Sequence, residues 1–187
     1  MNFKNLIYGL LICVIAISGY RLMQDDDAAL VHIDDSQQAP EFTGKNLLNT
    51  TYDETGIRNY RIYSDQMEYF SKSGKSYFDS PKMYIYREGE VIEWKVTAKT
   101  GILDKEHNLV LSGDVLIDNQ LPDASFDTLE TESLTINLDS KDFSSNVKVT
   151  LQGPLFKNIG NAMKGNFDQN VATLSNKVQG YYEQTTP

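Results

Sequence analysis

The side chains that could carry chemistry in this 187-residue sequence are mostly carboxylates. There are 26 Asp and Glu residues, but only two histidines, His32 and His107, and one cysteine, Cys13. A pair of carboxylates can hydrolyse a glycosidic bond by acid–base chemistry. No pair stands out by its spacing, and the sequence has no G-x-S-x-G, H-E-x-x-H, Walker-type or C-x-x-C motif. We therefore expect no catalytic residues, no metal site and no cofactor.

The composition is that of an acidic protein with enough apolar residues for a core. Seventeen Lys and Arg residues against the 26 acidic ones give a net charge of −9. Proteins that grip a nucleic-acid backbone need a basic face, so a nucleic-acid partner is not expected. The lone cysteine excludes an internal disulfide and a thiolate-rich zinc site.

Residues 1–23 are predicted to form an N-terminal transmembrane helix. No charged residue lies between Lys4 and Arg21, and the apolar run approaches the roughly 20 residues that span a bilayer. A cleaved signal peptide is the alternative, because small residues precede Gly19 at a suitable cleavage position. In both cases the rest of the chain is expected outside the cytoplasm, since Lys4 precedes the span and acidic residues follow it.

The remainder is predicted to be a flexible acidic linker, residues 24–41, followed by one all-β domain, residues 42–187. The linker lacks periodicity, whereas apolar and polar residues alternate with a period of two beyond Thr43. Turn-forming residues separate the alternating runs, which predicts roughly eight to ten antiparallel strands. The clearest apolar sets are Ile92, Trp94, Val96 and Ala98; Leu109, Leu111, Val115 and Ile117; and Leu134, Ile136 and Leu138.

A serine recurs three residues before an apolar residue, at spacings of 31 or 32 residues. The copies begin at Ser80, Ser112, Ser144 and Ser175. A period of this size predicts an array of strand pairs that bury their apolar faces against their neighbours. Chance recurrence of serine is the alternative.

Two further features concern what such an array could bind. Nine aromatic residues lie between Tyr52 and Tyr86, either as ordinary strand residues or as the lining of an apolar groove. The final strand, near residues 171–182, carries Lys177 as its only charged residue. It is therefore expected to accept a neighbour's strand, unless the tail after Tyr182 covers it.

The order and spacing of several segments resemble the LptC family over essentially the whole chain. These segments are Gly56–Ile62 (GIRNYRI), Val91–Ala98 with Trp94, Leu121-Pro122-Asp123, Val149–Gly153, Gly160–Gly165 and Lys177-Val178. The resemblance implies a single-pass inner-membrane protein of lipopolysaccharide export in Gram-negative bacteria, with a cytoplasmic N-terminus. It also implies that the periplasmic domain is a twisted, incompletely closed β-jellyroll of antiparallel strands.

The resemblance further implies partners. The chain would receive lipopolysaccharide from the LptB, LptF and LptG transporter, hold its acyl chains in an apolar groove, and pass it to the bridge protein LptA by edge-strand augmentation. Because LptB hydrolyses the ATP, the chain itself would not be an enzyme.

By matching segments, the resemblance also implies roles for eight residues. The lipid-binding positions are Leu47, Phe78 and Ala172; the C-terminal edge that docks LptA contains Lys177, Val178 and Tyr182; and the glycines needed for assembly are Gly56 and Gly153. Each glycine follows a strand, where a turn or bulge with positive φ is expected.

Two other functions remain open from the residues alone. One is a secreted structural or adhesive β-sandwich that polymerises through its strand edges. The other is a carbohydrate-active enzyme on a jellyroll. A groove open to an apolar interior would favour lipid transport over both.

Overall fold

The computed structural model describes residues 39–122 and 126–182. The predicted anchor, residues 1–23, and the predicted linker up to residue 38 lie outside these described residues. Within the described part of the chain, no helix is long and apolar enough for a membrane span.

The described residues form a single antiparallel sheet of fourteen strands. This is more than the sequence predicted, because several of the expected long strands are interrupted by a bend. In chain order the strands are β1 (Phe42–Tyr52), β2 (Arg58–Phe70), β3 (Lys75–Asp79), β4 (Lys82–Arg87), β5 (Val91–Thr97), β6 (Thr100–Leu103), β7 (Asn108–Asn119), β8 (Thr128–Asn137), β9 (Asp142–Ser145), β10 (Val149–Gly153), β11 (Phe156–Gly160), β12 (Ala162–Asn166), β13 (Val171–Ser175) and β14 (Gln179–Tyr182).

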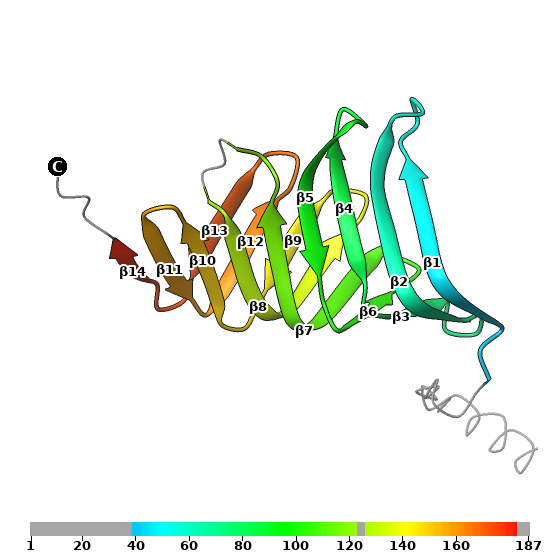
Figure 1. Ribbon diagram of the computed structural model, residues 1–187. Coiled ribbons are helices and arrows are strands. Elements are labelled where there is room, and N and C mark those ends of the chain that lie inside the picture. Colours follow the sequence, from blue (N-terminus) through cyan, green and yellow to red (C-terminus); the bar gives the residue numbers. More distant parts are fainter. Residues whose placement is uncertain (1–38, 123–125, 183–187) are drawn as a thin grey trace, which may run out of the picture. The chain divides into compact units, whose positions relative to one another are not determined.

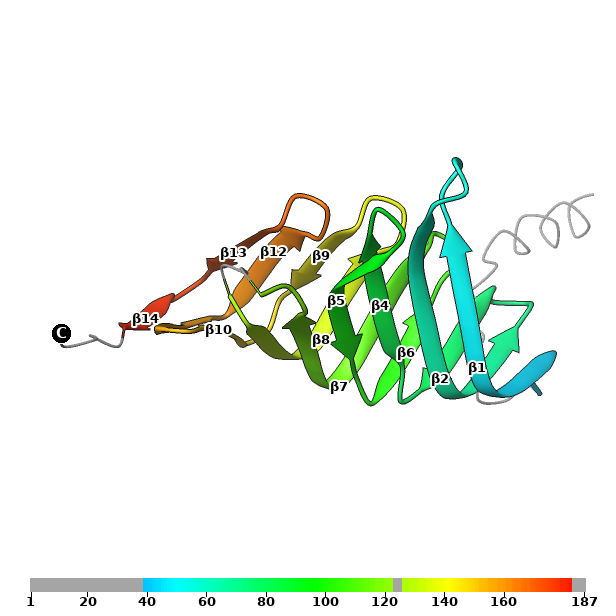
Figure 2. The same cartoon turned by 45° about the horizontal axis from the view of Figure 1, so that its top comes forward.

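The sheet is folded lengthwise into two layers (Figures 1 and 2). The long strands β2, β7 and β8 belong to both layers, because their two halves pair with different neighbours. In β7, for example, residues 109–112 pair with β6 and residues 116–119 pair with β5. The first layer also contains β4, β5, β10, β11 and β14, and the second contains β3, β6, β9, β12 and β13. The edge strand β1 pairs with both halves of β2 and therefore also belongs to both layers.

The bends of successive strands lie along one line, which we call the fold line. Several residues there adopt a left-handed backbone, including Asn46 in β1, Ser80 between β3 and β4, and Gly113 in β7. Backbone hydrogen bonds connect neighbouring bends: Ser80 N donates to Lys99 O at 2.8 Å, and Lys99 N donates to Gly113 O at 3.0 Å. The four recurring serines lie at or beside the fold line, so the period of 31–32 residues is the chain length between every second bend.

The core lies between the two layers. The alternating sets in β7, and in β8 with the residue that follows it, are buried as predicted: Leu109, Leu111, Val115, Ile117, Leu134, Ile136 and Leu138. In β5 the predicted alternation of buried and exposed residues was partly wrong. The register shifts within this strand, because Ile85 pairs with Trp94 whereas Tyr86 pairs with Ile92. This shift of register leaves Glu93 as an extra residue in β5, and its side chain is buried beside that of Trp94.

The aromatic residues of the first strands divide between the two faces of the sheet. Tyr60 packs against the core, whereas the rings of Tyr63 and Tyr84 contact each other edge to face, with 5.7 Å between their centroids. The latter two lie on the outer face, as Tyr63 pairs with Lys82 and Tyr84 pairs with Arg61. This division favours the interpretation of these tyrosines as ordinary strand residues.

Candidate functional site: the apolar interior and its mouth

A continuous apolar interior runs between the layers from β1 to β13. In its middle the side chains exclude solvent completely: Leu109, Leu129, Leu134 and Val149 are 0% exposed. Toward the two ends the apolar side chains that pack against this core are only partly buried. They include Leu47, Tyr60 and Met67 near β1 and Phe156, Ala172 and Leu174 near β13; two others, Ala98 and Leu103, lie between these ends. The interior is therefore fully buried in its middle, and its apolar side chains become partly exposed toward both ends.

All three residues predicted to contact lipid belong to this interior. Phe78, on β3, is buried in the core opposite Met67 and Gly101. Leu47, on β1, follows the bend at Asn46 and packs against the core from the edge strand. Ala172, on β13, packs against the core at the far end. The structure thus places Leu47 and Phe78 at one end of the interior and Ala172 at the other.

The sheet is not closed, and both of its ends are edge strands. Among the described residues, β1 pairs only with β2, β13 pairs only with β12, and β14 pairs only with β11. The predicted final strand is divided at the fold line into β13 and β14, with Lys177 at the bend in a left-handed conformation. Val178 is 52% exposed and Tyr182 is 75% exposed, so the predicted C-terminal edge is accessible.

The two predicted glycines meet different structural needs. Gly56 has a φ of 83° in the turn between β1 and β2, as expected. The expectation of a positive φ at Gly153 was wrong, because this residue ends β10 with an ordinary backbone and pairs with Phe156. Its requirement is space, since a Cβ atom on Gly153 would lie 2.3 Å from the ring of Phe156.

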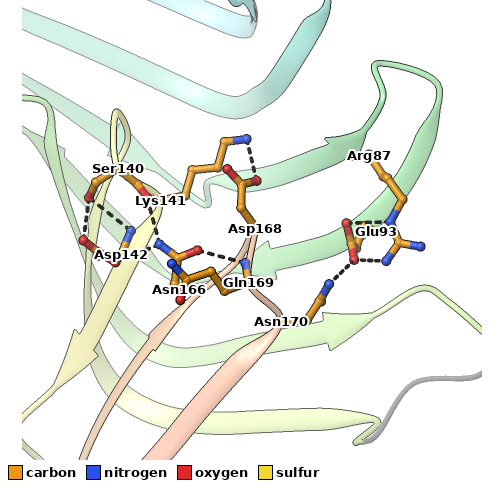
Figure 3. Close-up of polar contacts among 9 residues, drawn as sticks. All are labelled: Arg87, Glu93, Ser140, Lys141, Asp142, Asn166, Asp168, Gln169 and Asn170. Atoms are coloured by element: carbon orange, nitrogen blue, oxygen red, sulfur yellow. Dashed lines mark hydrogen bonds and ion pairs between the residues drawn. The ribbon is translucent and has the colours of Figure 1, made fainter.

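Opposite the fold line, hairpin turns of the two layers approach each other, and we call this side the mouth. Three polar side chains, those of Arg87, Glu93 and Asn170, connect the two layers across the mouth, and we call this cluster the clasp (Figure 3). Asn170 Nδ2, in the β12–β13 turn, donates a 2.9 Å hydrogen bond to Oε1 of Glu93 in β5. Arg87 pairs with the same carboxylate from β4 through Nη2 and, at 3.2 Å, through Nε. The hydrogen bond to Glu93 and its negative charge raise the pKa of Arg87.

Aromatic rings fill the mouth beside the clasp. The ring centroid of Trp94 lies 5.4 Å from that of Phe126 and 5.6 Å from that of Phe167, which in turn lies 4.5 Å from that of Phe143. Phe167 belongs to the same turn as Asn170 and is almost completely buried. The contact between Trp94 and Phe167 therefore reinforces the closure that the clasp makes.

The β12–β13 turn is fixed firmly to its own layer (Figure 3). Asn166 Nδ2 donates to the carbonyl oxygen of Ser140 at 2.9 Å and to Oδ1 of Asp142 at 2.8 Å. Lys141 Nζ lies 2.7 Å from Oδ1 of Asp168, and Phe167 N donates to Lys141 O. Hydrogen bonds from Asn166 and Ser140 lower the pKa of Asp142.

Neither the clasp nor the role of Phe167 is predicted from the sequence. The predicted apolar set Ile92, Trp94, Val96 and Ala98 leaves the polar face of the strand to Glu93, and Phe167 and Asn170 lie among turn-forming residues that separate two alternating runs. The available signal was a large aromatic residue inside a polar turn, since Phe167 is flanked by Asn166 and Asp168. Within residues 39–122 and 126–182 no group of three or more His, Cys, Asp or Glu side chains is arranged to hold a metal ion.

The fold and interior of the described residues define a class of protein: an open antiparallel sheet, folded around an apolar interior, that ends on both sides in edge strands paired along one side only. The described fold is similar to the crystal structure of LptH, the LptA-homologous periplasmic component of the lipopolysaccharide transport device of Pseudomonas aeruginosa. The TM-score is 0.52 at 9% identity, over 67% of this chain and 95% of that one. At this identity the likeness concerns the fold alone.

Sequence relatives identify the family. The chain is 28% identical to the lipopolysaccharide export system protein LptC of Haemophilus influenzae, over 98% of this chain and 96% of that protein. It is also 28% identical to the protein of the same name from Escherichia coli K12, over 94% of this chain and 93% of the relative. Residues 8–183 match the family described as "Lipopolysaccharide-assembly, LptC-related". The chain belongs to this LptC family, as the resemblance implied.

Proposed function

We propose that this chain carries lipopolysaccharide between the inner membrane and the periplasmic bridge. It receives the lipid from the LptB, LptF and LptG transporter and delivers it to LptA, and its interior shields the acyl chains on the way. The observation that carries this proposal is the apolar interior that reaches both edge strands, with Leu47 and Phe78 at one end and Ala172 at the other.

The energetics favour shielding over tight capture. Each methylene group left in water costs about 0.8 kcal/mol, which the apolar interior avoids. Transfer from a bilayer into that interior exchanges one apolar environment for another, so the net gain is small. The direction of transport must then come from the transporter that hydrolyses ATP.

The placement of the rest of the chain is part of the proposal. Residues 1–23 form the inner-membrane anchor with a cytoplasmic N-terminus, residues 24–41 form the linker, and residues 42–187 form the periplasmic domain. The C-terminal edge formed by Lys177, Val178 and Tyr182 accepts a strand of LptA. In support, β14 has one edge with no partner strand in the described part of the chain, and Val178 and Tyr182 are exposed.

A photo-crosslinking amino acid at Phe78 tests the proposal. In vesicles that contain the transporter and lipopolysaccharide, we expect an adduct that depends on ATP. The matched control is the same crosslinker at Tyr77, the neighbouring residue, whose side chain points to the opposite face of β3. Equal adducts at both positions, or none at Phe78, Leu47 and Ala172, would contradict an interior path.

The family match gives no support to a secreted adhesive protein or to a carbohydrate-active enzyme.

A further inference from the structure

The proposed cargo has to cross the mouth of the folded sheet. An amphiphile holds its acyl chains between the layers and its sugars in water. The bonds that join the acyl chains to the sugars must therefore lie in the gap between the two layers at the mouth. Movement from the β1 end to the β13 end then requires a gap that is open along the whole path. The clasp and the contact between Trp94 and Phe167 close this gap from β5 to the β12–β13 turn.

We propose that the clasp is a gate on the lipid path. Acyl chains pass from the end that contains Phe78 to the end that contains Phe156 only after Asn170 separates from Glu93. This inference rests on the proposed function and adds to it a closed state that the lipid, or the force that drives it, must open.

The contacts around the clasp suit a gate that opens by separation of the layers. The β12–β13 turn is held to the second layer through Asn166 and through the ion pair of Lys141 with Asp168. It will therefore move with that layer. Arg87 belongs to the same layer as Glu93, so the buried carboxylate keeps its cationic partner when Asn170 leaves. Opening thus breaks one polar contact without leaving an unpaired buried charge.

The closed state also leaves a polar group unsatisfied. Trp94 is 2% exposed, and its Nε1 donor has no acceptor among the described residues. A buried donor without a partner disfavours the conformation that buries it. Parting of the layers would give this donor access to water or to an oxygen atom of the lipid, which offsets part of the lost packing.

A reversible lock across the mouth tests the gate. In a full-length Cys13→Ser background, Glu93→Cys and Asn170→Cys are joined with a short bis-maleimide whose spacer contains a reducible disulfide. The control pair is Lys95→Cys with Asp118→Cys, which are directly paired on β5 and β7 within one layer. Both proteins carry a photo-crosslinker at Phe78 or at Phe156, in vesicles with the transporter, ATP and lipopolysaccharide.

We expect the locked clasp to retain the adduct at Phe78 and to lose the adduct at Phe156, with recovery after reduction. Loss at both positions, again reversed by reduction, would also support the gate and would extend it to loading. The locked control pair should leave both adducts unchanged. An undiminished adduct at Phe156 in the locked protein would overturn the gate while leaving the proposed function intact. Absence of an adduct at Phe78 in the unlocked protein would instead refute the proposed function and the gate together.

A second variant opens the gate without a crosslink. Asn170 has a φ of 54°, which glycine adopts freely, so Asn170→Gly removes the amide donor while keeping the turn. We expect the initial rate of adduct formation at Phe156 to rise about tenfold, as fits the loss of a hydrogen bond to a charged group. Because Trp94 is the only tryptophan, acrylamide quenching of the isolated full-length chain should also become faster. An unchanged rate together with unchanged quenching would count against the gate, provided that the variant unfolds at the same denaturant concentration as the parent.

Discussion

The hydroxyl groups of Thr131 and Ser145 lie 3.0 Å apart, both buried, where β8 and the connection from β9 to β10 cross the fold line. Thr131 Oγ1 also lies 3.0 Å from the carbonyl oxygen of Lys148. One threonine side chain therefore joins the bend of its own strand to the neighbouring bend. The fold line is held by side-chain hydroxyls as well as by the backbone.

Replacement of this threonine by its apolar isostere should destabilise the domain. Thr131→Val keeps the shape of the side chain but leaves Ser145 and the carbonyl group of Lys148 without this partner. We expect the free energy of unfolding to fall by about 1–3 kcal/mol. Chemical denaturation measures this change. The control is Thr135→Val on the same strand, which is only partly buried and should change stability by less.

The two predicted glycines should respond differently to alanine. Gly56→Ala adds a Cβ atom in open space but at a φ of 83°, so we expect a loss of about 1 kcal/mol from backbone strain. Gly153→Ala must displace the ring of Phe156, and we expect a loss of about 1–3 kcal/mol. In a Phe156→Leu background the cost of Gly153→Ala should shrink, whereas that of Gly56→Ala should not. Equal costs in both backgrounds would show that Phe156 is not the obstacle.

Substitutions at the C-terminal edge should weaken binding of LptA without unfolding the domain. Val178→Arg and Tyr182→Asp place charges on exposed positions, so we expect unchanged thermal stability and reduced retention of LptA in a pull-down assay. Leu48→Arg is the matched control, because Leu48 is equally exposed, at 51%, on the opposite edge strand. Unchanged retention by both C-terminal variants would refute the assignment of this edge.

Acid should destabilise the turns beside the mouth through Asp142. Its pKa in the folded domain is lowered from 3.8 by hydrogen bonds from Asn166 and Ser140. The stabilisation is present above the pKa of the unfolded chain and is lost as the pH falls below 3.8 through the lower folded pKa. Denaturation curves at a series of pH values should thus show that the free energy of unfolding falls less on acidification for Asp142→Asn than for the parent. Parallel pH profiles would contradict this role.

The sequence predicted the strands well but not the fold line. Alternation places residues on one face only while the period of two continues, as it does from Leu134 to Leu138. Leu129 and Leu134 are both fully buried although they are five residues apart, an odd separation. The phase of the alternation therefore changes where β8 crosses the fold line. No local pattern distinguishes such a change from the end of a strand, which explains why the bends were not predicted.

The functional site divides in a similar way. Phe78 was identified through its segment, and its inward orientation follows from alternation along β3. The contact of Glu93 with Asn170 joins residues 77 positions apart. This contact depends on the extra residue in β5 and on the way the second layer folds over the first. Neither feature can be predicted from the spacing of residues along the sequence.

The regular bends also restrict how a protein of this build can evolve in length. The chain returns to the same layer, running in the same direction, after 31 or 32 residues. A single inserted residue within a strand would exchange inner and outer side chains up to the next bend. Duplication or deletion of a complete 32-residue segment would preserve that pattern, so the length of the sheet can change only in whole increments of this size.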